Sequence, residues 1–189
     1  MLKHSSSNAS KFKQNLINEI NKSLLNLDEE KIYKLSQLIY NNKNQNMFFM
    51  GVGKSENFSN HMADMLKSLG YKAFNMNHTN CLHGDLGCIK EKNLVFAISK
   101  SGKSYELEKP LNIIKQKNAF VIGLFCKDNT ILTNICDYNL ILPLPNELDP
   151  NFNLVPTTSF VIYSSFLALL IRHLFELENI GILDYGQNH

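Results

Sequence analysis

The spacing of apolar residues changes about a quarter of the way along the 189-residue chain. Over residues 11–27, and again over 31–40, apolar side chains recur every three or four positions, which is the spacing of helices with one buried face. Asp28 lies between these segments and has the short acceptor side chain that is typical of a helix N-cap. We therefore expect two helices here, preceded by a disordered N-terminus over residues 1–10.

Short apolar runs and longer helical patterns alternate through the rest of the chain. Apolar runs without polar alternation suit strands that are buried on both faces, as in a parallel sheet. The expected strands are 47–50, 71–76, 94–98, 120–125 and 140–142. The expected helices are 55–69, 104–117, a short one at 130–136, and 156–178. Repeated strand–helix units of this kind imply an α/β fold with a parallel sheet and helices on both of its faces.

Two unusual loops face each other if the strand order is flavodoxin-like. Ligands of parallel sheets bind beyond the carboxyl ends of the strands, at the point where the strand order reverses. In a flavodoxin-like sheet that point lies between the first and third strands, which here end at GVGKS (51–55) and SKSGKS (99–104). We therefore expect these two loops to form opposite walls of one crevice.

Both loops contain Gly-Lys-Ser, the triplet that also ends the P-loop of nucleotide-binding proteins. A P-loop needs a further glycine five residues before the glycine of this triplet, but Phe48 and Ala97 stand at those positions. The dinucleotide-binding pattern fails as well, because Glu56 occupies the place of its third glycine. The loops therefore do not predict a nucleoside triphosphate or a dinucleotide as the ligand.

The second loop still suits a single phosphate group. Ser99, Ser101 and Ser104 offer three hydroxyls, and Gly102 allows a tight turn before the helix expected at 104–117. Backbone N–H groups at a helix N-terminus carry partial positive charge and favour anions. The alternative is that Ser104 is only an N-cap and that the other serines fill a turn. The loop alone leaves both interpretations open.

Composition and charge exclude several classes of partner. The formal net charge is +2 and the lysines are scattered, so nothing predicts a nucleic-acid surface. The four cysteines contain no Cys-x-x-Cys pair, which favours free thiols over zinc or disulfides. The N-terminus has no apolar core of the kind found in signal peptides. Polar residues interrupt the apolar stretch at 160–175, and we interpret this stretch as a buried helix. We expect a cytoplasmic protein with no metal site and no membrane partner.

Six short motifs follow one another in a distinctive order. They are GVGKS (51–55), HGDLG (83–87), AISKSGKSYEL (97–107), NELDP (146–150), LVPTTS (154–159) and NH (188–189). In this order they resemble the sugar isomerase (SIS) domain family, and within it the arabinose-5-phosphate isomerases of the KpsF and GutQ type. The resemblance implies a three-layer αβα sandwich around a five-stranded parallel, flavodoxin-like sheet. We therefore treat residues 11–189 as a single SIS domain.

The resemblance also implies a small phosphosugar as the ligand, with no metal, nucleotide or other cofactor. Ser99, Ser101 and Ser104 match the phosphate-binding serines of the family, and we add Ser55 from the first loop to them. Members of the family are usually dimers or tetramers in which a neighbouring subunit completes each active site. We therefore expect a homo-oligomer.

Four further residues match functional positions of the isomerases. Lys54, Glu147 and His189 match positions that are regarded as catalytic, and His83 matches the histidine that faces the sugar. We prefer Glu147 as the base, because a partly dry cleft can raise the pKa of a carboxyl toward neutrality. Lys54 could stabilise a developing oxyanion, and His83 or His189 could move protons. Without the resemblance, we would interpret Glu147 as a solvated loop residue, and Lys54 and His83 could be an exposed helix-start lysine and a turn-capping residue.

Two departures from the family's pattern affect the prediction of function. Lys103 stands where close relatives have a glutamate that is considered catalytic, and the chain ends at His189, where relatives often continue into CBS domains. Our first hypothesis is an isomerase that interconverts D-arabinose 5-phosphate and D-ribulose 5-phosphate through a cis-enediolate. The alternatives are a non-catalytic regulatory protein that binds a sugar phosphate, and an isomerase for another phosphosugar.

Overall fold

The computed structural model describes residues 6–144, 146–148, 152, 154–179, 181 and 186. Within these residues, five parallel strands form one sheet in the order β2-β1-β3-β4-β5. The strands are β1 (Met47–Gly51), β2 (Ala73–Asn75), β3 (Leu94–Ser99), β4 (Phe120–Phe125) and β5 (Tyr138–Ile141). The order is flavodoxin-like and reverses between β1 and β3, which confirms the predicted fold class.

The strands lie at the centre of the molecule because they are apolar on both sides. Every residue of β1 and β3 is buried, and successive side chains point to opposite faces of the sheet. Phe49 and Phe96 stack at a centroid distance of 4.4 Å within one apolar cluster, whereas Phe48 and Val95 belong to the cluster on the other face. The unbroken apolar runs therefore correctly predicted strands that are buried on both faces.

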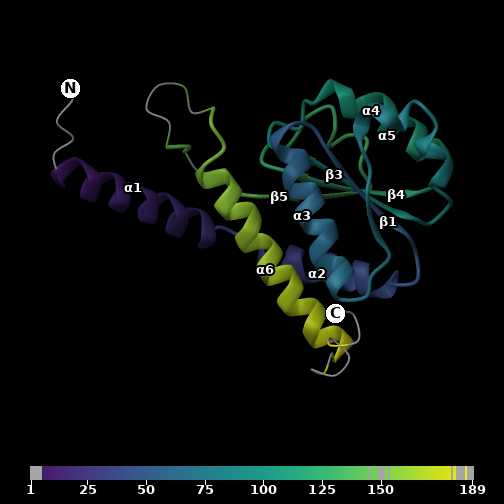
Figure 1. The fold of residues 1–189 in the computed structure, drawn as a ribbon, viewed down its shortest axis with the longest axis horizontal. Helices are drawn as coiled ribbons and strands as arrows, with labels where there is room; N and C mark the ends of the chain where they lie inside the picture. The colour runs from purple at the N-terminus through teal and green to yellow at the C-terminus, as the bar shows by residue number, and fades with distance from the viewer. Residues whose placement is uncertain are drawn as a thin grey trace.

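Helices cover both faces and make the three layers. One face carries α2 (Glu29–Asn41), α3 (Lys54–Ser68) and α6 (Thr158–Glu178), and the other carries α4 (His78–Cys81), the 3-10 turn η1 (Asp85–Cys88) and α5 (Tyr105–Gln116). Helix α1 (Ser6–Leu24) contacts α6 and extends away from the body of the molecule (Figure 1). Asp28 is the N-cap of α2, as predicted, since its Oδ1 accepts a hydrogen bond from the Lys31 N–H at 2.9 Å.

Several boundaries differ from the expected ones. Helix α1 begins at Ser6, although we expected disorder up to residue 10; extending an existing helix gains one backbone hydrogen bond for each residue added. The segment at 130–136 forms turns and not the expected helix. There the Thr133 hydroxyl accepts from the N–H of Thr130 and donates to the carbonyl of the same residue. Such local side-chain bonds compete with helical hydrogen bonding.

Helix α6 needs a second correction. We expected polar residues to keep its apolar stretch from spanning a bilayer, but this 21-residue helix contains an 18-residue window, with a mean hydropathy of 1.6, that is sufficient by length and composition alone. In the fold, its residues Phe166, Leu170 and Leu174 are fully buried in the cluster that also holds residues of α2 and α3. The helix therefore packs in the core of this fold.

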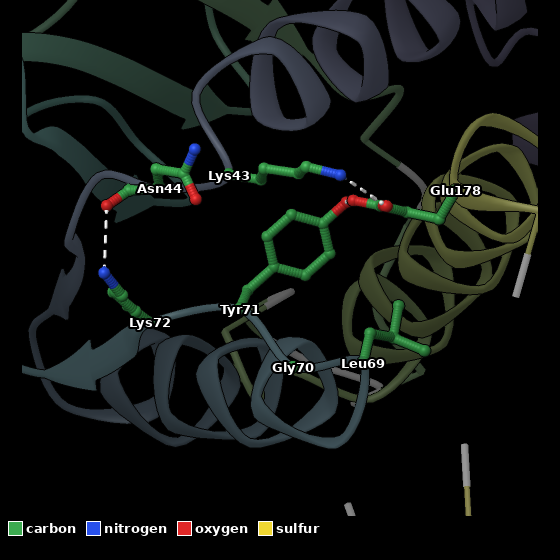
Figure 2. Close-up of a pocket in the computed structure, with 7 residues that line it drawn as sticks. All are labelled: Lys43, Asn44, Leu69, Gly70, Tyr71, Lys72 and Glu178. Carbon is green, nitrogen blue, oxygen red and sulfur yellow. Dashed lines mark hydrogen bonds and ion pairs between the residues drawn. The ribbon is translucent and has the colours of Figure 1, made fainter. Parts of the chain in front are cut away.

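The C-terminal end of α6 is anchored at the edge of the sheet opposite the two loops. Figure 2 shows Lys43, Tyr71 and Glu178 meeting beside a cavity of about 350 Å³. The Tyr71 hydroxyl donates to one carboxylate oxygen of Glu178, and the Lys43 ammonium donates to the other, both at 3.0 Å. Burial, together with the Glu178 carboxylate, raises the pKa of Tyr71, so this hydroxyl stays protonated. A carboxylate at a helix C-terminus opposes the helix dipole, and these two donors offset that cost.

We predict that Glu178→Ala lowers the free energy of unfolding by about 1–3 kcal/mol, because the buried Tyr71 hydroxyl would lose its acceptor. Urea denaturation at pH 7 measures the change. The matched control is Glu176→Ala on the same helix, because the ion pair of Glu176 with Arg172 is solvent-exposed; its effect should stay within about 0.5 kcal/mol. Equal effects of the two substitutions would show that the anchor contributes no stability.

Candidate functional site

The two loops line one crevice at the carboxyl ends of β1 and β3. A cavity of about 390 Å³ is bounded by Ser55 from the start of α3 and by Ser99, Ser101 and Ser104 from the loop between β3 and α5. We call it the serine cavity. Its other lining residues are Lys100, Lys127, Leu144 and Leu154. The four serines that we expected to bind phosphate therefore lie together, on opposite walls, as the strand order implies.

Hydrogen bonds hold the serine loop in one conformation. The hydroxyls of Ser99 and Ser104 lie 2.9 Å apart, and the N–H of Gly102 donates to the Ser99 hydroxyl at 3.1 Å. Gly102 has a φ of 65°, and a Cβ atom at this position would clash with the side chain of Thr130. This position therefore requires glycine. Ser104 is the N-cap residue of α5, but its side chain makes no capping bond, which disfavours a purely capping role.

A second, smaller cavity adjoins the first. It measures about 200 Å³, and we call it the inner cavity. Ser55, Lys100 and Leu154 line both cavities, so the two are adjacent, and we call them together the cleft. Lys54, in the first turn of α3, lines the inner cavity. The buried Tyr163 of α6 lines it as well. The remaining lining residues of the inner cavity are Val52, Pro156, Ser159 and Phe160.

Glu147 lies behind this cleft and not at its surface. Its side chain is completely buried and lines neither cavity. One carboxylate oxygen accepts from the Lys100 ammonium at 2.5 Å. The other accepts from the backbone N–H groups of Thr157 and Ser159, at 2.8 and 3.1 Å, and from the hydroxyls of Thr157 and Thr158. The carboxylate therefore caps the N-terminus of α6.

This environment contradicts the raised pKa that we expected for Glu147. Burial alone would raise the pKa of this carboxyl, but the donors at Lys100, Ser159 and Thr157 outweigh it and lower the pKa to about 2. Hydrogen bonds to the charged form stabilise that form. At neutral pH Glu147 is thus a fixed negative charge, and a carboxyl with such a low pKa is a poor acceptor for a proton from carbon.

The cleft itself is cationic. Lys54, Lys100 and Lys127 line it, and none of the described residues that line either cavity is an aspartate, a glutamate or a histidine. Sequence reasoning missed Lys100, Lys127 and Tyr163 as lining residues. Lys100 lies within the serine motif and could have been noticed there, whereas no local sequence signal distinguishes Lys127. The arrangement suits an anionic ligand.

Two further residues that the sequence singled out, His83 and Lys103, do not line this cleft. His83 is exposed in a turn between α4 and η1 and lines neither cavity. Lys103 is exposed and lines neither cavity; its backbone N–H donates to the Ser101 hydroxyl at 3.2 Å. His189 lies outside the described residues. Among the residues that are described, no group of three potential ligands is arranged to hold a metal ion.

Comparison with known proteins identifies the family. The SIS domain family matches residues 38–172, and the chain belongs to this family. It is 35% identical over 143 residues to an uncharacterized protein of Chlamydia trachomatis, covering 76% of this chain and 43% of that protein. It is 34% identical over 133 residues to the arabinose 5-phosphate isomerase KpsF of Escherichia coli, covering 70% of this chain and 41% of that protein. The chain thus spans less than half the length of these relatives.

A solved structure supports the same assignment. The structure of the c3406 protein of E. coli CFT073 in complex with a phosphosugar superposes with a TM-score of 0.85 at 25% sequence identity, and each chain covers 100% of the other. The fold and the family are therefore those of proteins that include phosphosugar isomerases.

We predict that Glu147 makes folding stability depend on pH in acid. Because the pKa of Glu147 is lowered from 4.5 to about 2 in the folded state, its contribution is complete above about pH 4.5 and is lost as the pH falls toward 2. The contribution amounts to roughly 3 kcal/mol. Glu147→Gln should therefore be less stable at pH 7 and should lose less stability between pH 4.5 and 2.5, as measured by urea denaturation.

The control for this measurement is Glu91→Gln, which removes an exposed carboxylate that lines neither cavity. This variant should lose as much stability between pH 4.5 and 2.5 as the wild-type protein does. If Glu147→Gln also lost as much as wild type, the ion pair with Lys100 would contribute no pH-dependent stability.

Proposed function

We propose that this protein is a phosphosugar aldose–ketose isomerase that interconverts D-arabinose 5-phosphate and D-ribulose 5-phosphate. The observation that carries the proposal is the cleft itself, in which five serines and three lysines line two adjoining cavities. Two similar proteins carry the name arabinose 5-phosphate isomerase, one of them as a probable assignment, and a solved structure of similar fold holds a phosphosugar. Both findings support the proposal. We further propose that the protein acts in the cytoplasm, as a soluble enzyme.

The chemistry of each cavity suits one part of such a substrate. Hydroxyl groups and the N-terminus of α5 suit a phosphate monoester, because they donate hydrogen bonds to its oxygens. The inner cavity would then take the sugar, with Lys54 near the oxygen that becomes negative in the cis-enediolate. Isomerisation moves a proton from C2 to C1 and shifts the carbonyl from C1 to C2, and it consumes no cofactor.

We infer that the proton-transfer groups come from a neighbouring subunit or from His189. The described residues that line the cleft include no carboxylate and no imidazole, whereas His83 is exposed on the surface and available to a partner. An apolar surface supports association between copies of the chain. On helix α1, Phe12 is 53% exposed and Ile17 is 39% exposed. On helix α6, only a third of the most apolar 18-residue segment is buried. Such surfaces are typical of subunit interfaces.

A second candidate function is binding without catalysis, as in a regulatory protein that senses a sugar phosphate. Lys103 favours it, because this position holds a glutamate in the close relatives that the serine motif resembles. An isomerase for another phosphosugar is the third possibility, since a cleft with cavities of about 200 and 390 Å³ also has room for a hexose phosphate.

Incubation with D-ribulose 5-phosphate in D₂O, followed by NMR, separates these functions. We expect D-arabinose 5-phosphate to appear, with solvent deuterium at C2. Ligand binding without turnover or exchange would reject the enzyme and favour the sensor, whereas turnover of a hexose phosphate alone would favour the third possibility. In an active enzyme, Lys103→Glu should raise turnover; a fall would show that Lys103 has a role of its own.

The oligomer is tested separately by light scattering after size-exclusion chromatography. We expect two or four times the chain mass of 21.6 kDa. The double substitution Phe12→Asp and Ile17→Asp should shift the protein toward single chains, because it places charges on the exposed apolar stripe of α1. A single-chain mass for the wild-type protein at micromolar concentration would contradict the proposal.

A further inference from the structure

Lys100 occupies a special position in the cleft. It lines both the serine cavity and the inner cavity, and its side chain is 28% exposed. Its backbone is fixed at the end of β3, where its carbonyl accepts from the N–H of Cys126 at 3.2 Å. Lys100 is therefore shared by the cavity that suits a phosphate and the cavity that suits a sugar.

Glu147 holds the ammonium of Lys100 in place. The carboxylate is itself immobilised, because its second oxygen accepts four hydrogen bonds from residues 157–159 at the start of α6. Its first oxygen lies 2.5 Å from Nζ of Lys100. The ammonium of Lys100 has three N–H donors. Among the described residues, one of these donors is hydrogen-bonded, to Glu147. The other two are available to a ligand.

The other two lysines of the cleft are held less firmly. Lys54 and Lys127 are exposed, and among the described residues neither takes part in an ion pair. A charge that is fixed before the ligand arrives costs no reorganisation when the ligand binds, so it stabilises the bound anion more than a mobile charge does. Lys100 is therefore the lysine that this structure prepares for binding.

We propose that Lys100 is a ligand-contacting cation at the boundary of the two cavities and that Glu147 is its positioning residue. This inference rests on the proposed function, since it takes the ligand to be a phosphosugar. The ammonium donates to the phosphate group from the side that faces the sugar, while the serines and the N-terminus of α5 donate from the other side. Glu147 acts through Lys100 and does not touch the substrate.

A double-mutant cycle tests the proposal. The variants are Lys100→Met, Lys100→Arg, Glu147→Gln and the double variant Lys100→Met with Glu147→Gln. Calorimetry measures the affinity of each for D-arabinose 5-phosphate and for inorganic phosphate. The control is Lys109→Met, which removes the same charge from an exposed position of α5 that lines neither cavity.

We expect Lys100→Met to weaken binding of the sugar phosphate by roughly tenfold or more, because a hydrogen bond to a charged group is lost. Glu147→Gln should weaken it by a smaller factor. The double variant should bind no more weakly than Lys100→Met, because Glu147 acts only through Lys100. Lys100→Arg should retain part of the affinity, and Lys109→Met should bind as wild type does.

Folding is checked in parallel by circular dichroism. Lys100→Met leaves a buried carboxylate without its counter-charge and is expected to be the least stable variant, whereas the double variant removes both charges and keeps the test valid. A folded double variant that binds like wild type would overturn the inference. So would a Glu147→Gln variant that binds normally but loses turnover about a thousandfold, since that result would make Glu147 the base.

The same data separate this inference from the proposed function. Wild-type protein that binds the sugar phosphate through Lys100 but does not isomerise it would support the inference and reject the enzyme. Wild-type protein that binds only inorganic phosphate, with the same dependence on Lys100, would reject the sugar ligand alone. Protein that binds neither compound would reject both proposals.

Discussion

The reversal of strand order at β1 determines where every candidate residue lies. Because β1 stands between β2 and β3, the loops after β1 and β3 leave the sheet side by side, and the helices that follow them lie on opposite faces. Ser55 and the serine loop are brought together by this topology although they are more than forty residues apart in the chain. The close approach of Gly102 to Thr130 then fixes the conformation of the second loop.

Helix α6 adds the third wall, and two carboxylates fix its position. Glu147 accepts hydrogen bonds from its first residues, and Glu178 in its last turn accepts from Tyr71 and Lys43. The helix contributes Tyr163 and Phe160 to the inner cavity, so the shape of that cavity depends on how firmly the helix is held. Glu147 connects the two roles, because the carboxylate that caps the helix also holds the ammonium of the cleft.

The sheet and the crevice could be predicted because their signals are local. Apolar runs such as 47–50 and 94–98 have the composition of strands buried on both faces, and the loops between strands and helices follow from them. The pairing of Lys100 with Glu147 could not be predicted, since it joins residues 47 positions apart through tertiary structure. The direction of the pKa shift of Glu147 depended on the same contacts, and a buried carboxyl without them would have shifted the other way.

The excess of lysine over acidic residues in the lining of the cleft also has a kinetic consequence. A neutral sugar that diffuses past the cleft experiences no net attraction. A dianionic phosphate ester is attracted over about one Debye length by Lys54 and Lys127, whereas Glu147 largely offsets the charge of Lys100 at that distance. On the proposed function, selection against unphosphorylated sugars therefore begins during the encounter, before any hydroxyl group of the sugar is contacted. Added salt would weaken this selection while leaving the shape of the cavities unchanged.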